Sequence, residues 1–88
     1  MNALDTMTAT DRTNQYRATL TDGTTLTVER NANVDEWMVS TFDADARPCH
    51  DVMAYGITKS EAVAVAGALL AGASRVAAQD AGKAVANV

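Results

Sequence analysis

Residues 15–30, QYRATLTDGTTLTVER, decide the fold, because they form two alternating runs around the turn dipeptide Asp22-Gly23. This pattern is typical of a β-hairpin. A two-residue loop would mix apolar and polar side chains on each face of the hairpin. A three-residue loop over residues 21–23, with Gly23 in the left-handed conformation, gathers the apolar side chains on one face, so we predict that register. The predicted pairs are Tyr16 with Val28, Ala18 with Leu26 and Leu20 with Thr24.

Two further strands are expected after the hairpin. Residues 36–42, EWMVSTF, are apolar on both faces when extended, which indicates a central strand or one that is covered on its second face. Residues 49–55 can add a short fourth strand after the aspartate-rich turn FDADARP. We therefore expect an antiparallel meander of three or four strands.

The C-terminal third of the chain has a helical period. Thr58 and Glu61 have the spacing of a capping box, in which each side chain accepts a hydrogen bond from the other residue's backbone amide. We expect one long helix over residues 59–79 that ends near Gly82. Its apolar stripe, which should pack on the hairpin, consists of Ala62, Val65, Leu69, Ala73 and Val76, flanked by Ala66 and Leu70.

The predicted fold class is α+β, with a three- or four-stranded antiparallel meander and one long C-terminal helix packed on one face. With 88 residues, the chain has room for one small domain. We assign residues 1–14 to a flexible N-terminal tail, residues 15–80 to the single α+β domain and residues 81–88 to a flexible C-terminal tail.

Charge and cysteine content narrow the classes of partner. The net charge of −4 argues against direct nucleic-acid binding, which normally requires a basic face. No apolar run approaches the roughly 20 residues of a membrane span, and the first residues lack the apolar core of a signal peptide. The single cysteine excludes an internal disulfide and fits a reducing compartment. We therefore expect a cytoplasmic protein without membrane contact.

Opposite the apolar stripe, the expected helix carries small residues where a solvated face would carry lysine and glutamate. Small side chains at four-residue spacing allow a second helix to approach closely, so this face predicts a homodimer. Alanine is also the best helix former and costs little to expose, so the same pattern fits a plain solvated face. The predicted self-association residues are Ala64, Ala68, Ala71 and Arg75.

Acidic residues are concentrated between positions 35 and 51, where Arg47 is the one basic residue. Such a segment can bind a basic protein partner, although turns also favour aspartate and acidic loops keep small domains soluble. The residues that we predict to contact a protein partner are Asp35, Glu36, Asp43 and Asp45.

The adjacent residues Cys49, His50 and Asp51 form a candidate for nucleophilic or metal chemistry. In an extended strand Cys49 and His50 point to opposite faces, so they cannot act together. Residues 43–45, DAD, lack the further ligands of a calcium loop. We therefore predict no catalytic residue, no bound metal and no cofactor, with a small metal- or thiol-dependent enzyme as an alternative.

The order of the expected elements resembles that of HicB-type antitoxins over residues 16–72. The resemblance rests on the hairpin, on the strand containing WMV, on the turn ending in Pro48 and on residues 56–62, GITKSEA, which match the family's Gly-x-Thr-x-x-Glu-Ala signature. It implies a partial RNase H-like sheet with a helix, in a cytoplasmic antitoxin that dimerises and neutralises a small basic toxin. The family's aromatic-proline pairing after the third strand is replaced by FDADARP.

From the sequence we predict a non-catalytic protein-binding module. It would be a small acidic accessory or regulatory protein of bacterial or phage type, acting by protein–protein contact as a homodimer. A HicB-like antitoxin is the second hypothesis.

Overall fold

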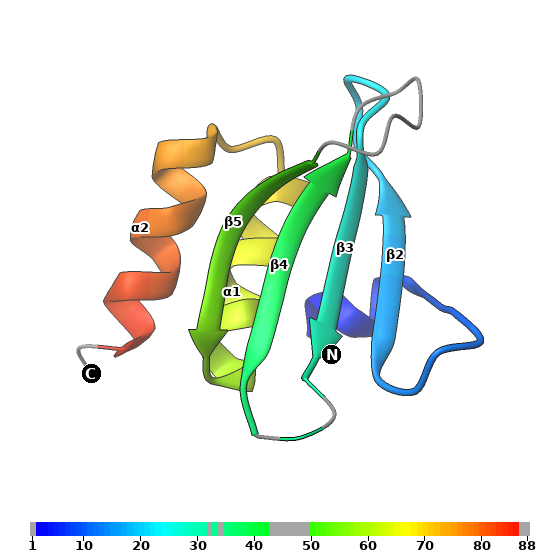
Figure 1. Ribbon diagram of the computed structural model, residues 1–88. Helices are drawn as coiled ribbons and strands as arrows, with labels where there is room; N and C mark the ends of the chain where they lie inside the picture. The colour runs from blue at the N-terminus through cyan, green and yellow to red at the C-terminus, as the bar shows by residue number, and fades with distance from the viewer. Residues whose placement is uncertain (1, 32, 34, 43–49, 87–88) are drawn as a thin grey trace.

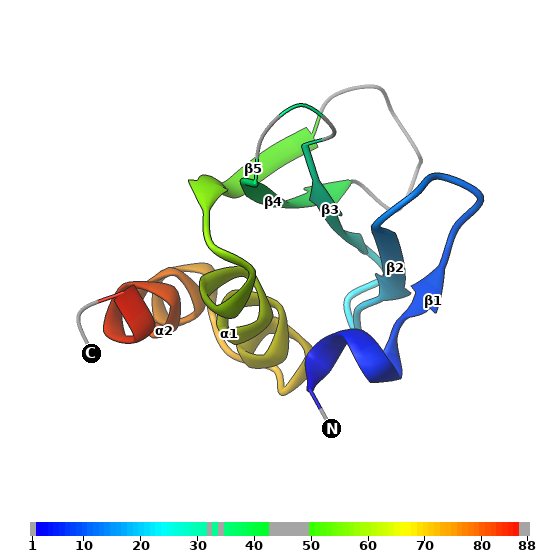
Figure 2. The ribbon, with the colours of Figure 1, turned by 90° about the horizontal axis from the view of Figure 1, so that it is seen from below.

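The computed structural model describes residues 2–31, 33, 35–42 and 50–86, the last of these ranges with side chains from residue 54 onward. In this part of the chain, a five-stranded antiparallel sheet in the order β1-β2-β3-β4-β5 has one α-helix packed on one face and a second α-helix beside the first (Figure 1, Figure 2). The strands are β1 (Thr8–Ala9), β2 (Gln15–Thr19), β3 (Thr25–Arg30), β4 (Trp37–Phe42) and β5 (His50–Ile57). The helices are the 3₁₀ helix η1 (Ala3–Thr6) and the α-helices α1 (Lys59–Leu70) and α2 (Arg75–Ala86). The α+β class and the antiparallel meander are confirmed, with more strands and one more helix than predicted.

The hairpin of β2 and β3 has the predicted register. Ala18 pairs with Leu26, and the Leu20 amide donates to the carbonyl of Thr24 at 2.8 Å. Gly23 has a φ of 90°, the left-handed conformation that the three-residue loop requires. The apolar side chains of the hairpin therefore gather on the face that α1 covers.

The core lies between α1 and the central strands β3 and β4. The capping box at the start of α1 is confirmed, because the Glu61 amide donates to Thr58 Oγ1 at 3.2 Å and the Thr58 amide donates to Glu61 Oε1 at 3.4 Å. The first part of the predicted apolar stripe is also confirmed. The buried apolar residues of these elements are Leu26, Val28, Trp37, Val39, Ala62, Val65, Ala66 and Leu69.

The prediction of one long C-terminal helix is wrong, because the chain breaks at Gly72 between α1 and α2. Gly72 has a φ of 91°, and its amide and that of the next residue donate to carbonyls in the last turn of α1. This pattern is a Schellman motif, which ends a helix at a left-handed residue. Ser74 then caps α2, since its hydroxyl accepts a hydrogen bond from the Ala77 amide at 3.2 Å. Val76, predicted to face the sheet, is therefore 68% exposed on α2.

The N-terminal residues, which we predicted to be a flexible tail, instead pack against the domain. The Asn2 side chain caps η1 by accepting from the Leu4 amide at 2.9 Å, and Asp5 accepts from the Asn2 amide at 2.8 Å. Leu4 and Met7 are buried beside α1, and β1 pairs with β2. Burial of each of these side chains is worth about 2 kcal/mol, which explains why the segment folds back onto the domain.

The C-terminal residues from position 81, also predicted to be a flexible tail, continue α2 as far as Ala86. Small residues line the contact between α2 and α1, where Ala78 and Gly82 are buried. A Cβ atom at Gly82 would lie 2.6 Å from Cγ2 of Val65, so the glycine permits the close approach of the two helices. Figure 2 shows α2 beside α1 in the helical layer, beyond the edge of the sheet formed by β5.

Candidate functional site

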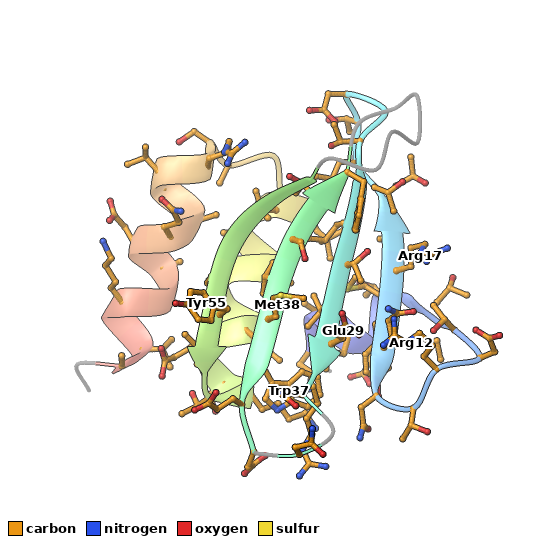
Figure 3. All side chains as sticks on the ribbon, viewed as in Figure 1. Arg12, Arg17, Glu29, Trp37, Met38 and Tyr55 are labelled. Carbon is orange, nitrogen blue, oxygen red and sulfur yellow. The ribbon has the colours of Figure 1, made fainter. Side chains whose placement is uncertain are left out.

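The two faces of the sheet differ in what covers them. The helices pack on one face, and the opposite face, which we call the outer face, points toward the viewer in Figure 3. Glu29, Met38 and Tyr55 form one row across β3, β4 and β5 on the outer face, because Glu29 pairs with Met38 and Met38 pairs with Tyr55. Tyr55 is 77% exposed, more than any other large hydrophobic side chain in the described part of the chain.

A β-bulge at Gly56 turns Tyr55 toward the outer face. A regular ladder continued from the end of β5 would place Tyr55 opposite Val39, whose side chain is fully buried under the helices. Gly56 is instead the extra residue at a register shift, with a φ of 67°, so that Tyr55 pairs with Met38 and Ala54 takes the inward position opposite Val39. The local backbone therefore holds in solvent an aromatic ring that a regular strand would bury.

Tyr55 lies at a groove on the outer face. The groove has a volume of about 700 Å³ and is lined by the end of β3, the start of β4, the end of β5 and the residues before β2. Met38 and Tyr55 adjoin charged side chains there. A concave site of this size that combines apolar and polar groups is typical of a binding site.

An ion pair and two hydrogen bonds fix one wall of the groove. Arg12 Nη2 lies 3.7 Å from Glu29 Oε2, and the buried Gln15 donates from Nε2 to the same oxygen at 3.2 Å. Gln15 Oε1 in turn accepts from Thr10 Oγ1 at 2.7 Å. These contacts tie the segment between β1 and β2 to β3, so the Glu29 carboxylate is held in place and its charge is matched.

The connection between β3 and β4 forms the other wall. Arg30 Nε lies 3.3 Å from Asp35 Oδ1. Glu36 lines the groove, and its carboxylate makes no hydrogen bond or ion pair with the residues that the structure describes; the same holds for the carboxylate of Asp11. Glu36 Oε2 lies 3.8 Å from the position that a Cβ atom of Gly56 would occupy. The groove thus combines an exposed aromatic ring with an unpaired carboxylate beside the bulge.

The residues predicted to contact a protein partner are only partly placed. Glu36 lines the groove, and Asp35 lies next to it in the ion pair with Arg30. Asp43 and Asp45 lie outside the described residues. Partner binding by the whole acidic segment stays a prediction, but the structure gives Glu36 a defined neighbourhood.

The predicted self-association residues are spread over two helices and the turn between them. Ala64 and Ala68 lie on α1, Ala71 follows α1, and Arg75 begins α2. Ala68 also packs against the core. A second helix does approach α1 closely, but it is α2 of the same chain. Homodimerisation through these four residues stays a prediction.

The candidates for catalysis and metal binding are placed in part. Cys49 lies outside the described residues, and His50 and Asp51 are placed only by their backbone at the start of β5. Among the side chains that the structure describes, no group of three or more His, Cys, Asp or Glu residues could hold a metal ion. Within the described ranges, no helix is long and apolar enough to cross a membrane.

The sequence analysis did not identify Tyr55 and Met38 as site residues. Their shared face depends on two register shifts between β4 and β5, one on each side of the pairs that Ala54 and Tyr55 make. The available signal was Gly56 inside a strand pattern, since such a glycine often marks a bulge.

In comparisons with protein-family models, curated proteins and solved structures, nothing matches the chain. The resemblance to HicB-type antitoxins therefore stays a prediction from sequence motifs. The geometry of the groove is the basis for the function that we propose.

Proposed function

We propose that the chain is a non-catalytic protein-binding module, a small acidic accessory or regulatory protein that binds its partner through the groove on the outer face. The bulge at Gly56 is the observation that carries the proposal, because it holds the ring of Tyr55 in solvent beside Met38. We also propose that the module acts in the cytoplasm, where its single cysteine stays reduced.

Tyr55 has the properties of an interface anchor. A tyrosine ring that is buried on binding removes roughly 150 Å² from water, which corresponds to about 4 kcal/mol. Because the ring is 77% exposed, the folded chain gains little from it, and its replacement by alanine should change the free energy of unfolding by about 0.5 kcal/mol or less. Binding and stability can therefore be separated at this position.

Selection of peptides tests the proposal without a known partner. A phage-displayed library of random peptides is selected on the immobilised protein, and the affinities of the selected peptides are measured for the wild type, Tyr55→Ala and Val76→Ala. Val76 is a matched control, since it is an exposed apolar side chain on α2. We expect peptides whose affinity falls at least about tenfold with Tyr55→Ala and by less than about twofold with the control.

Two results would contradict the proposal. One is a library that yields no binding peptides, and the other is a set of peptides with equal affinity for Tyr55→Ala and the wild type. Circular dichroism of both variants should match that of the wild type, because neither side chain is part of the core.

A further inference from the structure

The unpaired carboxylate beside Tyr55 indicates what the groove binds. Building on the proposed function, we infer that the groove takes an arginine side chain of the protein partner, with its guanidinium between the ring of Tyr55 and the carboxylate of Glu36. Three features of the groove support this inference: its surplus of negative charge, the position of Glu36 and the exposed face of the aromatic ring.

The groove has more acidic than basic side chains in its lining. The acidic residues are Asp11, Glu29 and Glu36, and the basic residues are Arg12 and Arg30. Both arginines already have a carboxylate partner, at 3.7 Å for Arg12 and 3.3 Å for Arg30. The carboxylates that are left without a partner among the described residues favour a cationic occupant and repel an anionic one.

The position of Glu36 directs that cation toward Tyr55. The Glu36 carboxylate lies against Gly56, the residue that follows Tyr55 in β5. Glu36 and Tyr55 both line the groove, and Gly56, which lies against the carboxylate, carries no side chain of its own. A cation at this point gains both an ion pair with Glu36 and a cation–π contact with the ring.

Arginine fits these two partners better than lysine does. Its planar guanidinium stacks on an aromatic face and offers a fork of donors that matches a carboxylate. A lysine ammonium is a compact and strongly hydrated charge that satisfies the carboxylate but gains less from the ring. The groove, at about 700 Å³, is large enough for the side chain and for the flanking backbone of a peptide.

A double-mutant cycle with the selected peptides tests the inference. In each peptide whose binding depends on Tyr55, arginine is replaced by citrulline, which has the same shape but no charge. Both forms are then titrated against the wild type, Glu36→Gln and the control Asp80→Asn on the exposed surface of α2. We expect citrulline to lower the affinity about tenfold on the wild type and on the control, and about twofold on Glu36→Gln.

The outcomes separate this inference from the proposed function. Peptides that depend on Tyr55 but lack arginine, or that lose the same affinity with citrulline on Glu36→Gln as on the wild type, would overturn the arginine site and leave the binding module intact. Lysine that replaces arginine without loss of affinity would overturn the preference for a guanidinium. A failure to obtain any peptide that depends on Tyr55 would overturn both proposals.

Discussion

Gly82 lies at the contact between α2 and α1. Alanine in place of a helical glycine usually stabilises a protein, but at Gly82 we expect alanine to destabilise it. A methyl group at this position would place its carbon 2.6 Å from Cγ2 of Val65, which is almost fully buried. Because such carbon atoms are normally about 3.5–4.0 Å apart, the overlap is about 1 Å. Overpacking of this kind costs about 1–3 kcal/mol, while the helix propensity of alanine returns about 1 kcal/mol. We expect Gly82→Ala to lower the free energy of unfolding by about 1 kcal/mol.

Gly67 in α1 provides the matched control. A Cβ atom there would lie 3.7 Å from the Cβ atom of Ala3, which is an ordinary van der Waals contact. Gly67→Ala should therefore raise the free energy of unfolding by about 1 kcal/mol through helix propensity. Urea unfolding followed by the fluorescence of Trp37, the single tryptophan and a core residue, measures both variants.

Removal of the clash should reverse the sign of the effect of Gly82→Ala. In a Val65→Ala background the added methyl group has space, so Gly82→Ala should stabilise that variant by about 1 kcal/mol. If Gly82→Ala instead stabilises the wild-type chain as Gly67→Ala does, α2 does not pack on α1 at the separation that the structure shows.

Three further predictions concern the N-terminal segment, the cap of α2 and the hairpin loop. Leu4→Ala should cost about 2–3 kcal/mol, since Leu4 is buried, whereas an unchanged urea midpoint would show that the segment does not pack on the domain. Ser74→Ala should cost about 1 kcal/mol through loss of the hydrogen bond from the Ala77 amide, and equal stability would contradict this cap. The hydroxyl and then the amide of Thr24 donate to the Asp22 carboxylate and lower the pKa of Asp22. The contribution of these hydrogen bonds to the free energy of unfolding is present above the pKa of an unfolded aspartate and is lost as the pH falls through the lower folded-state pKa. Asp22→Asn should lack this pH-dependent loss of stability. An ordinary pKa in an NMR titration of Asp22 would refute the prediction.

Local signals were sufficient to predict the hairpin and the start of α1. In residues 15–30 one register alone gathers the apolar side chains on one face, so the alternation predicted both the pairing and the left-handed Gly23. Thr58 and Glu61 predicted the first residue of α1, because a capping box depends only on residues three positions apart.

The break between α1 and α2 required information that is not local. Gly72 followed by Ser74 has the form of a helix stop and a new cap, but a glycine within an alanine-rich helix costs only about 1 kcal/mol. The balance is decided by the burial of Ala78 and Gly82 against α1, which becomes possible only when the chain turns back. The helical period of the sequence contains no information about the contact between α1 and α2.

The groove was not predicted, because it too depends on contacts between residues that are far apart in the sequence. Glu36 was identified from its charge, but its neighbours come from three strands and from the segment before β2. The exposure of Tyr55 depends on the register shifts that lie on either side of it in β5, one of them at Gly56, and a one-residue shift exchanges the two faces of a strand. In the sequence, Gly56 also begins the helix signature, which offered a different explanation for the same residue.

An NMR titration of the ¹⁵N-labelled chain with a selected peptide tests most directly whether the partner binds at the groove. We predict that the largest amide shift changes map to residues 36–38 and 54–57, around Tyr55 and Glu36, and that Tyr55→Ala abolishes them. Shift changes that map instead to residues 75–86 on α2, and that persist in Tyr55→Ala, would contradict the outer face as the binding surface.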